Sequence, residues 1–363
     1  MALMLDKMKK FVEDHPTLVT ASDNTINVVT FNVENCFADQ WSSKDKRPYE
    51  TSLVHVCNSH TFVYDTKGFS DHDMVFAKIS QVPQSHGYTI VPDLNVIRPD
   101  FVCIQELVDC RKSDINNADL CEKRIEKNRE TIGKYLNIPD HNHVSDGHSN
   151  CIFFDKNKWQ PTVAYQLVRN SEDKPLQLPV DDSTNNIDFT GVLKRKSTFW
   201  MRFKKQRKHV QKTTIWCHFD VKSDHQTKEK TNEQKVVVVC IHLQALFTTP
   251  GETNQHEFRN IMKNVINTLN REQSTQVILA GDFNTDDHSH YVKEFSHEFK
   301  RLDDYSPNIP TQHASNMNEN DMSHVLVKRI GRKFNTFNSK LDGVYSLIYT
   351  PSTSPDLKRS SSS

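Results

Sequence analysis

Short apolar runs separated by polar or turn residues are the feature that most constrains the fold of this chain. Seven of them are rich in Val, Ile and Phe and predict β-strands, over residues 26–32, 100–105, 151–154, 214–220, 235–242, 276–281 and 341–349. Several runs are apolar at nearly every position, which is typical of strands that are buried on both faces. Between them, two segments, 119–136 and 256–272, have the apolar stripe of an amphipathic helix. Many strands with few helices predict two sheets packed face to face, with the helices outside.

The chain has 363 residues, and its pattern predicts one large domain over residues 26–350. Residues 1–25 are predicted to form a helical extension, because Leu5, Met8, Phe11 and Val12 recur at helical spacing. Residues 351–363 end in a run of serines and are predicted to be a disordered tail. Residues 169–186 are polar and contain proline, which predicts a long loop.

The composition limits which ligands the whole surface could attract and indicates the cellular compartment of the protein. Lys plus Arg and Asp plus Glu both number 46, so any attraction for a polyanion must be local. The eight cysteines form no C-x-x-C pair, and Cys103, Cys151, Cys217 and Cys240 lie in apolar runs, which predicts reduced and buried thiols. No run approaches the roughly 20 apolar residues of a membrane span, and no signal-peptide pattern is visible. These observations predict a location in the cytosol or the nucleus.

Polar side chains stand at the ends of several predicted strands. Asn32, Glu106, His242 and Asp282 each end or follow an apolar run, and Asn284 comes two residues after Asp282. Each signal is weak by itself, because such residues also serve as turns and strand ends. Hydrolysis of a phosphodiester needs a cation, a group that orients water and donors to the phosphoryl oxygens. Oxygen ligands suit Mg²⁺, with Mn²⁺ as the alternative ion, so the sequence predicts such a site if these strand ends share an edge.

A series of motifs resembles the endonuclease/exonuclease/phosphatase superfamily over about residues 26–349. The motifs are Thr30-Phe31-Asn32-Val33-Glu34-Asn35, Arg98-Pro99-Asp100-Phe101 with Gln105-Glu106, Ile241-His242-Leu243, Gly281-Asp282-Phe283-Asn284 and Lys340-Leu341-Asp342. The segment 146–159, and His242-Leu243-Gln244-Ala245 followed by Glu257-Phe258-Arg259, are similar to the branch that holds nocturnin, the Angel proteins and the poly(A) deadenylases.

The resemblance implies a DNase I-like, four-layer α/β sandwich of two mainly antiparallel sheets with outer helices. It implies that Glu106 is the principal magnesium ligand and that Asn32 assists it. It also implies that Asp282 orients or deprotonates the attacking water, and that Asp342 supports a second, catalytic histidine.

The resemblance further predicts the residues that hold the substrate. Asn284 would place the phosphate or the metal, and His242 would donate to a phosphoryl oxygen. Asn150 and Arg259 are predicted to complete the substrate-binding set. The expected substrate is a nucleic acid, as single-stranded RNA or an oligonucleotide.

One motif departs from the family order. The family's second histidine lies in a Ser-Asp-His motif some tens of residues after the position of Asp342, and this chain has none there. Instead, Ser70-Asp71-His72 precedes an apolar run at 74–79. Either the closing strand has been relocated beside the first strand and His72 completes the site, or His72 belongs to a polar loop that leads into a helix around 74–80. The second alternative would leave a weakened or inactive enzyme.

Three functions follow from these motifs. The first is a magnesium-dependent 3′-exoribonuclease of the deadenylase and nocturnin type. The second is the same metal site acting on DNA, a 2′–5′ oligonucleotide, a phospholipid or an inositol phosphate. The third is a non-catalytic binding protein, which the displaced Ser-Asp-His motif suggests. A basic, aromatic segment at 194–212 is either a rim for a single strand or, as we favour, a strand pair with solvated lysines.

Overall fold

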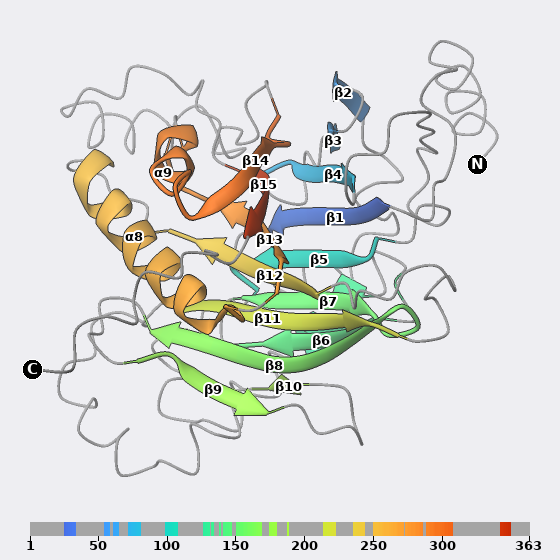
Figure 1. Ribbon diagram of the computed structural model, residues 1–363. Coiled ribbons are helices and arrows are strands. Elements are labelled where there is room, and N and C mark those ends of the chain that lie inside the picture. Colours follow the sequence, from blue (N-terminus) through green and yellow to red (C-terminus); the bar gives the residue numbers. More distant parts are fainter. Residues whose placement is uncertain are drawn as a thin grey trace, which may run out of the picture.

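In the part of the chain that the structure describes, a computed structural model of the protein contains two β-sheets and a small number of helices (Figure 1). The structure describes residues 25–33, 54–58, 61–64, 72–80, 99–107, 126–130, 132–133, 138, 141–146, 150–168, 174–179, 187–188, 213–222, 235–243, 250–271, 273–285, 288–307 and 342–349. The predicted N-terminal extension, the predicted tail and the basic segment 194–212 lie outside these residues.

The first sheet has eight strands and the second has seven. In spatial order the first contains β10 (Ile187–Asp188), β6 (His141–Ser145), β7 (Cys151–Asp155), β5 (Phe101–Gln105), β1 (Thr25–Asn32), β4 (Met74–Ser80), β3 (Thr61–Tyr64) and β2 (Val54–Asn58). The second contains β14 (Phe299–Asp304), β15 (Asp342–Tyr349), β13 (Thr275–Asp282), β12 (Lys235–His242), β11 (Thr213–Val221), β8 (Trp159–Val168) and β9 (Leu176–Pro179). Neighbouring strands are antiparallel except β1 with β5, β6 with β10 and β12 with β13.

The two sheets pack face to face over one apolar core. Side chains that alternate along the strands point into it, such as Val28 of β1, Cys103 of β5, Val238 of β12 and Ile278 of β13. The intervening side chains of the second sheet form another core, which is covered by α8 (Pro250–Thr268) and α9 (Ser289–Lys293). Figure 1 shows α8 lying across this outer face.

The outward side chains of the first sheet are also buried, as Val29 and Val102 show. Residues 126–130 and 132–133 are helical, and Ile132 among them is buried. The architecture is therefore the expected four-layer α/β sandwich of two mainly antiparallel sheets with outer helices.

The predicted strands are present with ends shifted by at most one residue. The helix predicted at 256–272 begins six residues earlier and ends at Thr268. The four cysteines predicted to be reduced, Cys103, Cys151, Cys217 and Cys240, are free and buried. None of the helices in the described part of the chain combines the length and the apolarity that a membrane span requires.

The prediction of a continuous loop at 169–186 is wrong, because β9 lies within it. Leu176 and Leu178 pack against the core between the sheets, while Gln177 between them is exposed. This alternation is the pattern of an edge strand, and Pro179 is tolerated at its end because an edge strand leaves some backbone groups unpaired.

Candidate active site

Six strand ends meet at one edge of the sandwich. In the parallel pairs, Asn32 at the end of β1 faces Gln105 of β5, and His242 of β12 faces Asp282 of β13. The antiparallel strand β15 begins opposite, with Asp342 paired to Asp282. β4 is antiparallel to β1, so it also begins at this edge. The strand ends therefore share an edge, which was the geometric condition of the sequence prediction.

Gln105 joins the two sheets at this edge. Its Oε1 accepts a hydrogen bond from Thr30 Oγ1 of β1 at 3.2 Å. Its Nε2 donates to Cys103 O at 3.0 Å and to Cys240 Sγ of β12, in the other sheet, at 3.3 Å. Because both ends of this buried amide are bound, the residue that follows, Glu106, is held at a fixed place.

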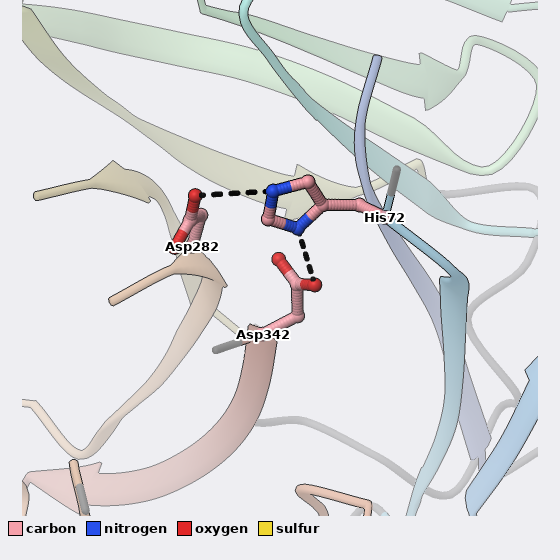
Figure 2. A group of neighbouring side chains, drawn as sticks. All are labelled: His72, Asp282 and Asp342. Atoms are coloured by element: carbon pink, nitrogen blue, oxygen red, sulfur yellow. Dashed lines mark hydrogen bonds and ion pairs between the residues drawn. The ribbon is translucent and has the colours of Figure 1, made fainter. Parts of the chain in front are cut away.

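His72 lies in the site, immediately before β4. Its Nδ1 lies 3.0 Å from Asp342 Oδ2, and its Nε2 lies 3.9 Å from Asp282 Oδ2 (Figure 2). The alternative of a helix around 74–80 is wrong, because β4 pairs with β1 on one side and with β3 on the other. A strand beside β1, as the first alternative expected, is therefore present, and whether His72 completes the site stays a prediction. The contact with Asp342 favours the tautomer that carries a proton on Nδ1.

His242 and Glu106 form a second pair. His242 Nε2 lies 3.1 Å from Glu106 Oε1 and 3.9 Å from Asp282 Oδ2. The His242 side chain is fully buried, whereas 21% of the Glu106 side chain is exposed. Glu106 also has a φ of 55°, a left-handed conformation that costs about 1–3 kcal/mol in a residue other than glycine. Glu106 therefore combines a strained backbone with a partly exposed carboxylate.

Asp282 is the centre on which these groups converge. Asn32 Nδ2 donates to its Oδ2 at 2.9 Å, and the Asn284 backbone N–H donates to its Oδ1 at 2.8 Å. Burial raises the pKa of Asp282, and the charge of Asp342 raises it further, while His72, His242 and the Asn284 N–H act in the opposite direction. A carboxylate in this position would be stabilised by an added cation.

The turn after β13 is built around glycine and Asn284. A Cβ on Gly281 would lie 1.9 Å from Ile241 O of β12, so only glycine lets the two strands approach this closely. Asn284 has a φ of 48°, and its Nδ2 donates to Leu243 O at 2.8 Å. Asn254 in the first turns of α8 donates to Asn284 O at 3.2 Å. The side chain and the backbone of Asn284 are therefore both anchored.

The two remaining predicted substrate residues lie differently. Asn150 precedes Cys151, which pairs with Ile104, so Asn150 lies beside the end of β5. Its backbone N–H donates to Asp146 Oδ1 at 3.0 Å. Arg259 of α8 instead pairs with Glu294 beyond α9, and its role in substrate binding stays a prediction. The basic segment 194–212 lies outside the described residues, so the question of a rim for nucleic acid also stays open.

The ligand types at this edge fit a hard divalent cation. One oxygen or nitrogen atom from each of His72, Asp282 and Asp342 lies within 4.8 Å of the other two. Glu106 adds the most exposed carboxylate, and Asn32 adds an amide whose nitrogen is already engaged by Asp282. Carboxylate and amide oxygens are the donors that Mg²⁺ takes. Sequence reasoning missed Asn254 and His288, because their effect depends on which segment they meet after folding.

Comparisons with known proteins give likenesses among solved structures. They include an endonuclease/exonuclease/phosphatase from Bacteroides vulgatus (12% identity, 89% of this chain and 87% of that chain covered, TM-score 0.42) and the human Nocturnin catalytic domain with bound sulfate (12% identity, 70% and 71%, TM-score 0.35). A mannosyl-6-phosphatase from Bacteroides thetaiotaomicron has 13% identity, with 89% and 85% covered and a TM-score of 0.41. No protein-family model and no curated protein sequence matches the chain. Identities and TM-scores of this size transfer no activity, so the function is inferred below from the site itself.

Proposed function

We propose that the protein is a metal-dependent phosphoester hydrolase whose active site lies at this edge. One observation carries the proposal: carboxylates and imidazoles from five strand ends, with the Asn32 amide from a sixth, converge within hydrogen-bonding or ion-pairing distance. These residues span positions 32 to 342 of the chain. Burying so many like charges together costs free energy, and folding tolerates that cost where a ligand later compensates it.

Glu106, assisted by Asn32, would hold Mg²⁺, with Mn²⁺ as the alternative ion. Glu106 is suited to this because its carboxylate is partly exposed and lies beside His242 at the edge where the strand ends meet. When bound, the cation neutralises charge that develops on the phosphoryl oxygens. It would also offset the burial, and after it the charge of Asp342, that raise the pKa of Asp282.

Asp282 would orient the attacking water and accept its proton. Its two oxygens are already fixed by Asn32 and by the Asn284 N–H, so the carboxylate cannot rotate freely. His242 would donate from Nε2 to a phosphoryl oxygen, and the support is that this nitrogen lies 3.1 Å from Glu106 Oε1 and 3.9 Å from Asp282 Oδ2. His72, oriented by Asp342 through Nδ1, would present Nε2 to the same region as a second stabilising group.

The substrate that we propose is RNA or an oligonucleotide, cleaved from its 3′ end, in the cytosol or the nucleus. The support comes from the segment 146–159, which resembles the deadenylase and nocturnin branch and places Asn150 beside the end of β5. The same metal site acting on DNA, a dinucleotide, a phospholipid or an inositol phosphate is the competing substrate class.

The test is hydrolysis of labelled oligo(A) by the full chain with Mg²⁺. We expect release of AMP that is lost on addition of EDTA, restored by excess Mg²⁺ and abolished in Glu106→Ala. Glu298→Ala is the matched control, because Glu298 is exposed on the segment after α9. Activity on DNA, dinucleotide or lipid substrates alone would overturn the substrate but keep the hydrolase. No metal-dependent hydrolysis of any of them would overturn the proposed function.

A further inference from the structure

His288 is a buried histidine that lies behind the active site and outside the predicted motifs. It immediately precedes α9, and only 3% of its surface is exposed. Its ring stacks on Phe283, with centroids 4.7 Å apart and an interplanar angle of 27°. Phe283 stands between Asp282 and Asn284, so one face of the imidazole supports the turn that carries both residues.

The same imidazole is fastened to β15. Its Nδ1 is hydrogen-bonded to the hydroxyl of Tyr345, at 2.5 Å, and the two rings are nearly perpendicular. Tyr345 is three residues beyond Asp342 on the same strand, and its side chain is buried. His288 therefore touches the segments that carry Asp282 and Asp342, the two carboxylates that lie on either side of His72 (Figure 2).

Gly343 shows how closely the imidazole approaches the backbone beside Asp342. A Cβ at this position would lie 2.8 Å from His288 Cε1 and 2.9 Å from Ser306 Oγ. Real Cβ atoms do not come this near to a ring atom, so any larger residue at 343 would displace His288 or the start of β15. The contact thus joins the catalytic edge of β15 to the turn after β13.

We propose that His288, together with Tyr345, is a positioning residue that sets the separation of Asp282 and Asp342 and thereby the orientation of His72. The inference rests on the proposed hydrolase site and deepens it. The ladder between β13 and β15 fixes these strands up to the pair Asp282 and Asp342, but it ends there. Phe283 lies one residue beyond that pair, and the imidazole that stacks on it is hydrogen-bonded to Tyr345, which lies within the ladder opposite Leu279. His288 therefore ties the turn after β13 to the paired part of β15.

Packing alone does not account for a histidine here. An apolar side chain could fill the space beside Phe283 and leave the Tyr345 hydroxyl buried without this partner, at a cost in stability. The imidazole instead supplies a flat face for stacking and a directed nitrogen for the hydroxyl. A misplacement of about 1 Å at a reacting group can cost about 10²-fold in rate, so small shifts of this unit would matter.

The test is Tyr345→Phe, which removes only the hydroxyl, with Tyr349→Phe as the matched control at the far end of β15. The first readout is the ¹⁵N spectrum of the His72 imidazole, assigned with His72→Gln. We expect the His72 ring signals to shift in Tyr345→Phe and to stay in place in Tyr349→Phe. On a substrate that the wild type hydrolyses, kcat should fall by up to about 10²-fold with KM within about twofold.

A second variant, Gly343→Ala, keeps the inference testable if Tyr345→Phe does not fold. Gly343→Ala should lower kcat by itself but cause no further loss in a background that carries His288→Ala and Ser306→Ala, because both clashing side-chain atoms are then gone. Unmoved His72 signals in Tyr345→Phe, or an additional loss from Gly343→Ala in that double background, would overturn the inference. If the wild type hydrolyses none of the substrates while the His72 signals still shift in Tyr345→Phe, that result would overturn the proposed function and leave the positioning role of His288 standing.

Discussion

One strand, β5, carries a carboxylate at each end, and the two ends differ in kind. Asp100, just before the strand, is almost fully buried and accepts hydrogen bonds from the Asn27 backbone N–H at 2.7 Å and from Trp159 Nε1 at 2.8 Å. Lys158 Nζ lies 2.6 Å from the same side chain. Glu106, just after the strand, is partly exposed and faces His242.

The two carboxylates differ in their partners, and we infer that Asp100 serves stability and Glu106 serves the proposed reaction. Every described partner of Asp100 is a donor that belongs to the fold, so its charge is compensated and its position serves stability. Glu106 sits in a left-handed conformation beside a histidine that also approaches Asp282, so its surroundings concentrate charge. Backbone strain and a concentration of charge are tolerated where a ligand or a reaction uses them.

The largest expected effect is at the end of β5 that carries Glu106. Glu106→Gln keeps the shape of the side chain but removes the charge that would hold the cation. We expect turnover to fall by about 10³-fold or more, because metal coordination contributes several kcal/mol of transition-state stabilisation. The thermal midpoint of unfolding should remain close to that of the wild type. Initial rates over a Mg²⁺ titration measure the loss of turnover. A turnover retained in Glu106→Gln would refute the metal-binding role of Glu106.

The next effect concerns the dyad on β4 and β15. His72→Gln should lower turnover by about 10²–10⁴-fold, the usual contribution of an acid–base group. Asp342→Asn should lower it as well, because an amide at this position no longer favours a proton on Nδ1. The double variant should be no worse than the poorer single variant, since residues that act as a unit are not additive. Losses that multiply in the double variant would show that His72 and Asp342 act independently.

The sequence predicted which side chains meet at this edge better than it predicted the number of strands. Continuous apolar runs such as that of β12 are visible because both faces are buried. β8 shows both the expected alternation and its limit, since buried Trp159, Pro161 and Ala164 are interleaved with exposed Gln160 and Thr162. Strands of this mixed kind resemble loops in sequence, and their pairing partners, which make them strands, are distant in the chain.

Some side chains at the site were likewise predicted from the sequence and others were not. Glu106, Asp282 and His242 stand at the ends of runs that were recognisable, and these three were predicted to converge. Asn254 and His288 were not predicted, because neither is marked by composition or periodicity. Each acts through one tertiary contact, with the Asn284 carbonyl and with Phe283 respectively. Such contacts follow from the packing of α8 and α9 and not from the sequence near them.

A smaller effect is expected at the structural end of β5, and on stability instead of rate. Asp100→Asn places an amide donor against the Asn27 N–H, the Trp159 indole N–H or the Lys158 ammonium. Removing one partner of a buried ion pair costs about 3–5 kcal/mol. We expect urea unfolding to show a loss of this order, while the rate per folded molecule is unchanged. A rate loss without destabilisation would show that the two ends of the strand are not distinct.

The smallest expected effect is a loss of stability at acidic pH. It distinguishes a buried histidine of the fold, His218, from the histidines of the site. His218 on β11 is hydrogen-bonded through Nε2 to Thr268 Oγ1 of α8, at 3.2 Å. Burial, and then the charge of Lys235, lower the pKa of His218 from 6.5 to about 4. Between these values the unfolded chain binds a proton that the folded protein does not, so stability declines as the pH falls from 6.5 toward 4.

The decline due to His218 should amount to about 2–3 kcal/mol, and above pH 6.5 the group should contribute no pH dependence. His218→Gln should flatten the dependence of the unfolding free energy on pH in this range, measured by urea titration at fixed temperature. The pH profile of hydrolysis should keep its shape in the same variant, because His218 lies in the outer layer beside α8 and not at the edge that carries Glu106. A profile that moved together with the stability would mean that acid inactivates the enzyme by unfolding it, and that the titration of the site's own histidines has no part in the loss.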